Sequence, residues 1–179
     1  MTSTRAFSSV DECLTALARG AGTFDEPDVD GLAHSLQCGA ILRTEHPADL
    51  ELAVAGLLHD IADAVTPDDH RDHDRRGADF VRPLLGDRVA HLVGAHVLAK
   101  RYLVRTDPAY QSELSDRSVE TLVLQGGVLD DAELRALDRD PELVSILALR
   151  RADERAKVPG ARVAGIDSWR DALATLARA

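Results

Sequence analysis

Apolar residues recur with helical spacing along almost the whole chain, whereas the alternating pattern of half-buried strands is nearly absent. Capping and helix-ending residues divide this pattern into segments. The predicted helices run from Ser8 or Ser9 to Arg19 and then over residues 31–44, 48–64, 73–85, 87–104, 115–124, 131–137, 142–157 and 167–178. The pattern therefore predicts an all-α bundle.

The segment 48–64 is the most apolar of these, so we expect it to cross the centre of the core. A polar loop over residues 23–30 precedes the second helix, Gly86 separates two later helices, and Asp107-Pro108 opens a turn. The chain has 179 residues without internal repeats or low-complexity linkers. Because domains of about 100 to 200 residues are usual, residues 1–179 are expected to form a single domain.

The charge balance narrows the classes of partner. The 21 Lys and Arg residues against 31 Asp and Glu give a net charge of −10, which argues against a nucleic-acid groove, because phosphate neutralisation needs clustered cations. A small anionic substrate needs only a few local cations. No apolar run approaches the roughly 20 residues of a membrane span, and the first residues lack the apolar core of a signal peptide. We therefore expect a cytoplasmic protein that binds neither nucleic acid nor membrane.

The number and positions of the histidines indicate a metal site. The 7 histidines outnumber the 6 large aromatic residues, and imidazole is the commonest metal ligand. His59 and Asp60 are adjacent inside the most apolar segment, where both are costly to bury without partners. Further ligand-type residues stand on or at the start of other predicted helices, namely His34, His73, His96 and Asp153. Four nitrogens and two carboxylates, one of which can bridge, indicate a site for two metal ions such as iron.

In these residues the chain resembles the HD-domain superfamily, whose minimal metal set is His, His-Asp, Asp. Within that superfamily it is similar to the mixed-valent di-iron oxygenases of phosphonate catabolism. The matching stretches keep their order and nearly their spacing from about residue 30 to the last helix, over residues 34–38, 57–60, 73–79, 94–104, 114–127 and 150–160. The resemblance implies an HD-domain helical bundle around a di-metal centre.

The resemblance also implies a role for each matching residue. One iron would be held by His34, His59, Asp60 and Asp153, and the other by His73 and His96, with Asp60 bridging both. The substrate phosphonate would contact Lys100, Ser118, Thr121 and Arg150. Helical spacing supports this anion site independently, because Lys100 lies four residues after His96 and Arg150 three before Asp153, so each cation shares a helix face with a ligand.

The chain departs from the family pattern on the substrate side. Where the family has a lid with a Tyr and a Glu, this sequence has Phe24 and Pro27, so Glu26 or a neighbouring Asp replaces the Glu only if the loop shifts. Asp63 stands where the family has a His that helps to hold the phosphonate. A carboxylate there repels a dianion unless it is protonated, paired with a cation or directed at a substrate ammonium.

The function implied by the resemblance is an O2-dependent oxygenase with two iron ions, in a mixed-valent Fe(II)/Fe(III) pair. It would cleave the C–P bond of 2-amino-1-hydroxyethylphosphonate or a close analogue, giving phosphate and a carboxylate such as glycine. An HD-type phosphohydrolase with the same metals is the alternative, with Asp63 orienting water. A non-enzymatic binding module is the third interpretation. We predict that His46 is solvent-exposed, that His70 is not a metal ligand and that His91 has a surface or packing role, and the oligomeric state stays open.

Overall fold

Residues 6–66 and 72–178 are described by the computed structural model, except for the side chains of Asp25 and Glu26. The elements in chain order are α1 (Val10–Ala18), β1 (Phe24–Glu26), β2 (Val29–Asp30), α2 (Gly31–Glu45), α3 (Leu50–Leu58), α4 (Ile61–Val65), α5 (His73–Thr106), α6 (Pro108–Glu113), α7 (Asp116–Leu124), α8 (Asp131–Leu137), α9 (Leu143–Arg155), the 3-10 turn η1 (Ile166–Trp169) and α10 (Arg170–Leu176). The predicted all-α bundle is confirmed.

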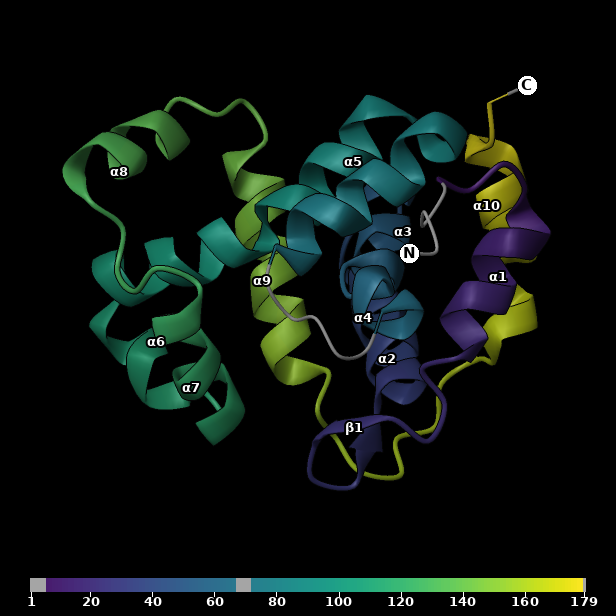
Figure 1. Cartoon of the computed structure of the whole chain (residues 1–179), viewed down its shortest axis with the longest axis horizontal. Helices are drawn as coiled ribbons and strands as arrows, with labels where there is room; N and C mark the ends of the chain where they lie inside the picture. Colours follow the sequence, from purple (N-terminus) through teal and green to yellow (C-terminus); the bar gives the residue numbers. More distant parts are fainter. Residues whose placement is uncertain (1–5, 67–71, 179) are drawn as a thin grey trace.

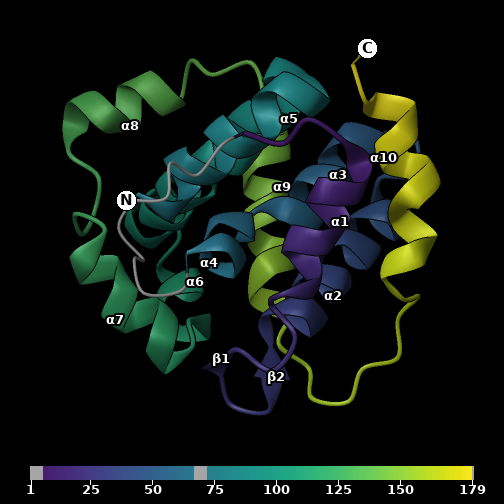
Figure 2. The same ribbon diagram turned by 45° about the vertical axis from the view of Figure 1, so that its right-hand side comes forward.

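Helices α2, α3, α5 and α9 pack against one another at the centre of the bundle. Helices α1 and α10 cover one side of this group, and α6, α7 and α8 lie on the opposite side, beyond α5 and α9 (Figures 1 and 2). As expected, the most apolar segment enters the core: Leu57 and Leu58 of α3 are completely buried, and Leu52 is 1% exposed. Ser9, Asp30 and Asp49 cap α1, α2 and α3, so local side-chain hydrogen bonds fix where these helices begin.

The prediction of one continuous helix over residues 48–64 is wrong. Helix α3 ends at Leu58 and α4 begins at Ile61, with Asp60 at φ −101° and ψ 18° between them. Neighbouring residues of a continuous helix point about 100° apart, so they do not face the same point. The break allows His59 and Asp60 to direct their side chains toward one place in the interior.

The chain bends at Gly86, as the sequence predicts. The helical segments on either side form the long element α5, but Gly86 itself has φ +90°, a left-handed conformation that favours glycine. A Cβ atom at this position would approach the Arg178 guanidinium within 2.5 Å. The segment before Gly86 carries His73, and the segment after it carries His96 and Lys100. The bend therefore determines how close His73 and His96 lie to each other.

Two short elements differ from the sequence-based expectations. Residues 23–30, predicted as a loop, contain the antiparallel hairpin of β1 and β2, which turns at Asp28 with φ +61°. The expected turn at Asp107-Pro108 instead begins helix α6, because Pro108 needs no amide hydrogen at the first helical positions and Asp107 accepts hydrogen bonds from the next two amides. Among the described residues, no helix has both the length and the apolar character needed to cross a membrane.

Candidate metal centre

The six predicted ligands, which lie far apart in the sequence, meet at the centre of the bundle. His34 comes from α2, His59 and Asp60 from the junction of α3 and α4, His73 and His96 from α5, and Asp153 from α9. They form two groups, within each of which the ligand atoms lie no more than 4.8 Å apart: His34, His59 and Asp153 in the first, and Asp60, His73 and His96 in the second.

Close approaches between nitrogen atoms define the two groups. In the first, Nε2 of His34 lies 3.2 Å from Nε2 of His59 and 3.2 Å from Oδ1 of Asp153. In the second, Nε2 of His73 lies 3.0 Å from Nε2 of His96. Two neutral imidazoles whose lone pairs face each other gain nothing from this approach unless a proton or an ion lies between them. Each group brings two imidazoles and one carboxylate together, and this donor set fits a metal ion.

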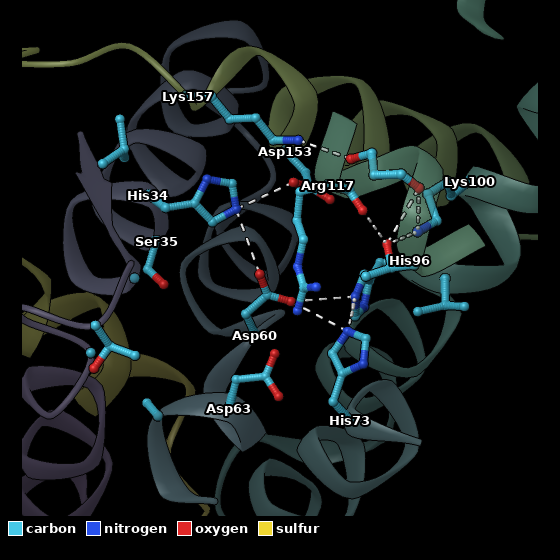
Figure 3. A pocket seen from close by; sticks show the side chains of 18 of the residues that line it. His34, Ser35, Asp60, Asp63, His73, His96, Lys100, Arg117, Asp153 and Lys157 are labelled. Atoms are coloured by element: carbon cyan, nitrogen blue, oxygen red, sulfur yellow. Dashed lines mark hydrogen bonds and ion pairs between the residues drawn. The ribbon is translucent and has the colours of Figure 1, made fainter. Parts of the chain in front are cut away.

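Asp60 lies between the two groups (Figure 3). Its Oδ2 atom is 3.1 Å from Nε2 of His59 and 3.6 Å from Nε2 of His34. Its Oδ1 atom is 3.5 Å from Nε2 of both His73 and His96. One carboxylate thus offers a separate oxygen to each group, which is the geometry of a bridging ligand.

Backbone carbonyl groups orient three of the four rings. Each accepts a hydrogen bond from Nδ1 of one histidine: Ala156 from His34 at 3.1 Å, Gly56 from His59 at 2.8 Å and Val93 from His96 at 2.7 Å. A neutral ring that donates from Nδ1 keeps its lone pair on Nε2, the atom that faces the groups described above. The packing around the site therefore selects the tautomer that a metal ion requires.

The electrostatics keep the carboxylates ionised. Burial opposes the charge on Asp153, but the Arg150 guanidinium and the histidines outweigh it and hold its pKa well below the usual range. Burial lowers the pKa of His96 to about 3, with a further contribution from His73. Burial acts in the same direction on His73, but the hydrogen bond and charge of Asp60 prevail and raise its pKa to about 9. A metal ion entering the second group must therefore displace a proton from His73.

A cavity of about 130 Å³ opens over both groups. One wall comes from α5, α7, α9 and the segment after α9, and its polar residues are Lys100, Arg117, Ser118, Thr121, Gln125, Arg150 and Lys157. The other wall comes from α1, the hairpin and the starts of α2 and α4, with Asp63 beside small and apolar residues such as Val29 and Ala64. In Figure 3, Asp63 lies on the far side of Asp60 from Lys157, so this carboxylate faces the cavity from the side opposite Lys157.

The predicted substrate residues all line this cavity. Nζ of Lys100 donates to Oγ1 of Thr121 at 2.8 Å, and Nη2 of Arg150 donates to Oγ of Ser118 at 3.3 Å. Burial and the charge of Arg150 lower the pKa of Lys100 to about 8. The four predicted groups therefore form one connected polar cluster beside the metal groups.

Sequence reasoning missed further residues of this wall, namely Arg117, Gln125 and Lys157, and also Glu154, which contacts the wall residues Ser118 and Lys157. The signal for the last two was available, because Arg150, Asp153, Glu154 and Lys157 follow the i, i+3, i+4, i+7 spacing of one helix face. The side chain of Glu154 is 9% exposed and accepts hydrogen bonds from Arg150 and from Lys157, the latter at 3.0 Å.

The proposed lid residues lie elsewhere. Phe24 is 62% exposed and is not among the residues that line the cavity. Glu26 belongs to β1, and its side chain lies outside the described part of the structure.

His46 and His91 belong to neither metal group. His91 is on the surface as predicted, 2.8 Å from Asp140. His46, which we expected to be solvent-exposed, is instead half-buried at the end of α2, and His70 lies outside the described residues.

Comparison with known proteins places this geometry in a family. Residues 31–153 match the HD domain. The chain is 34% identical over 160 residues to the hydroxymethylphosphonate dioxygenase of Gimesia maris, covering 84% of this chain and 78% of the relative. It is 36% identical over 132 residues to the glycine-betaine-forming 1-hydroxy-2-(trimethylamino)ethylphosphonate dioxygenase of Leisingera caerulea, covering 69% of this chain and 67% of the relative. Both relatives are named dioxygenases, in agreement with the expected oxidoreductase class. The chain belongs to the HD-domain family and is a relative of its phosphonate dioxygenases.

Proposed function

We propose that the protein is an O2-dependent di-iron oxygenase that cleaves the C–P bond of a 1-hydroxyalkylphosphonate. The observation that carries this proposal is the position of Asp60 between two histidine groups, directly beside a wall of cations and hydroxyls. Both named relatives act on phosphonates with a hydroxyl on the carbon next to phosphorus. In the balanced reaction the phosphonate dianion and one O2 give a carboxylate, hydrogen phosphate and one proton.

The metal ligands follow from the two groups. His34, His59 and Asp153 would hold one iron, His73 and His96 the other, and Asp60 would bridge them. Two irons in this arrangement, mixed-valent by the resemblance, supply the redox chemistry that reduces O2. The protein contributes imidazoles oriented by backbone carbonyls and two carboxylates kept ionised by their surroundings.

The phosphonate would bind the cationic wall. Lys100 and Arg150 supply charge, while Ser118 and Thr121 supply hydroxyl donors to the phosphonate oxygens. This placement directs the carbon end of the substrate toward the metal groups. Burial of Arg150 and Lys100, which are 5% and 3% exposed, strengthens their interaction with a bound anion because water screens it little.

Asp63 would select the substituent on the substrate. It lies on the opposite wall, beside small and apolar residues, where a cationic group on the second carbon of the substrate would reach it. A carboxylate at this place favours an ammonium-bearing substrate such as 2-amino-1-hydroxyethylphosphonate over hydroxymethylphosphonate, which has no cation. Glycine would then be the carboxylate product.

The function is tested by reconstituting the protein with iron under anaerobic conditions, adding ascorbate, and following O2 uptake and phosphate release. We expect equal amounts of O2 consumed and phosphate released, no phosphate without O2, and a higher kcat/KM for the amino-substituted substrate than for hydroxymethylphosphonate. The phosphohydrolase alternative predicts phosphate release from phosphomonoesters without any need for O2. That result would overturn the oxygenase proposal, and a preference for hydroxymethylphosphonate would overturn the role of Asp63.

The lowered pKa of Lys100 predicts the alkaline limit of substrate binding. Lysine is cationic below its pKa, which is about 8 here, so raising the pH through this value removes one positive charge from the phosphonate site. We expect KM for the phosphonate to rise above about pH 8. The Lys100→Arg variant, which keeps its charge, should shift this rise to higher pH. An unchanged alkaline limit in the variant would assign the limit to another group.

A further inference from the structure

We propose that Lys157 is a further anion-binding residue of this pocket and that Glu154 restrains it until the phosphonate binds. This inference rests on the proposed function, because it assigns an additional ligand to the phosphonate named there. Neither residue belongs to the set predicted from the sequence. Lys157 lines the cavity from the segment after α9, and Glu154 of α9 contacts its ammonium group.

The ammonium group of Lys157 lies within the polar wall of the cavity (Figure 3). Its Nζ is 3.0 Å from Oγ of Ser118, 3.0 Å from Oγ of Ser115 and 3.0 Å from Oε1 of Glu154. Only 14% of the side chain is exposed. Because Ser118 also accepts from Arg150, Lys157 shares a partner with a predicted phosphonate-binding cation.

Each of the three guanidinium nitrogens of Arg150 already has a hydrogen-bond or ion-pair partner. Its Nε donates to the Tyr110 hydroxyl at 2.6 Å, Nη1 pairs with Asp153 and Nη2 pairs with Glu154. Two buried carboxylates thus balance one guanidinium, whose planar shape fixes its direction. The positive charge of Arg150 is therefore largely balanced by Asp153 and Glu154. A dianion in the pocket needs additional positive charge.

Lys157 can supply that charge. Two of its contacts are with the neutral hydroxyls of Ser115 and Ser118, and the carboxylate of Glu154, which it also contacts, is shared with Arg150. Lysine carries its charge on a flexible stem with three rotatable donors, so a small change in the side chain redirects a donor from a serine hydroxyl to a phosphonate oxygen.

The charge of Glu154 leads to a prediction about the direction in which anion affinity changes. Its carboxylate receives Arg150, Lys157, the Ser118 hydroxyl at 3.2 Å and the Ser115 amide at 2.9 Å. A negative charge at this place holds the cations but also repels an incoming dianion. Removing the charge of Glu154 should therefore strengthen anion binding, whereas removing the charge of Lys157 should weaken it.

The test is the affinity of the iron-loaded protein for methylphosphonate, measured by calorimetry without O2. Methylphosphonate has the anion but no 1-hydroxyl group. We expect Lys157→Met to raise Kd by about 10-fold to 100-fold, the effect of one charge-assisted hydrogen bond. Arg155→Met is the matched control, because Arg155 is a cation two residues earlier that is 52% exposed and pairs with Glu45. It should change Kd by less than about 2-fold.

Glu154→Gln separates binding from folding, since a misfolded variant does not gain affinity. We expect it to lower Kd by about 3-fold to 10-fold. A Kd for Lys157→Met within 2-fold of the wild type, at unchanged iron content, would overturn the proposal, as would weaker binding by Glu154→Gln. The two proposals fail separately: the Kd pattern stands without phosphonate oxidation if only the oxygenase is wrong, and oxidation stands without the Kd pattern if only the role of Lys157 is wrong.

Discussion

Asp60→Asn is expected to lose bound iron and C–P bond cleavage together. The two carboxylate oxygens of Asp60 face different histidine groups, at 3.1 Å from His59 and 3.5 Å from His73. An asparagine offers one neutral oxygen and one amide donor, and the donor opposes a cation. We expect less than half of the wild-type iron content and a decrease in phosphate release of at least about 100-fold. Loss of a hydrogen-bond partner of a metal ligand typically lowers metal affinity or activity by about 10-fold to 100-fold, and loss of the ligand itself should have a larger effect.

Asp63→Asn is the matched control for this experiment. It makes the same chemical change three residues later, in a carboxylate that lines the same cavity but belongs to neither metal group. We expect it to keep the wild-type iron content, measured by metal analysis after desalting. Full iron content and activity within 10-fold of the wild type in Asp60→Asn would contradict the bridging role.

Arg150→Met is expected to produce the largest loss of stability. The substitution leaves the carboxylates of Asp153 and Glu154, which are 6% and 9% exposed, without their shared guanidinium. Breaking a buried ion pair from one side costs about 3–5 kcal/mol because the remaining charge stays buried. In a chain of this size this corresponds to a decrease of about 10 °C in Tm.

Arg151→Met provides the comparison for that measurement. Arg151 is the next residue of α9, 46% exposed, and pairs with Asp107 at 2.8 Å near the surface. A surface ion pair contributes about 0–1 kcal/mol, so this variant should unfold close to the wild-type temperature. Equal Tm values for the two variants would contradict the structural role assigned to Arg150. Thermal unfolding followed by circular dichroism makes the comparison.

The sequence predicted the parts of the fold that depend on local chemistry. Capping residues and glycines located most helix ends, including the bend at Gly86, because they act through their own backbone neighbours. The break at Asp60 escaped prediction because apolar spacing continues across it, and the break is favoured by interior ligand geometry rather than by a helix-ending residue. The strands of the hairpin, Phe24–Glu26 and Val29–Asp30, are too short to produce a strand pattern.

The candidate site divides in the same way. The six metal-type residues were found because residue type and order alone restrict them. Lys157 and Glu154 were missed, since charged residues near the end of an amphipathic helix usually face water, and only the docking of α7 against α9 turns these two inward. Tertiary packing decides which cations line a pocket, and the helical spacing of the sequence does not predict that packing.

The carbonyl groups that orient the histidines lie at very different distances from them along the sequence. His59 and His96 donate to carbonyls three residues earlier in their own segments, whereas His34 donates to Ala156, 122 residues away. The first group also takes Asp153 from α9, while the second is built from α5 and Asp60. Undocking of the C-terminal end of α9 would therefore release the ion of the first group and spare that of the second. Metal occupancy of the two groups would therefore report on local folding: the first group on the docking of α9, and the second on α5.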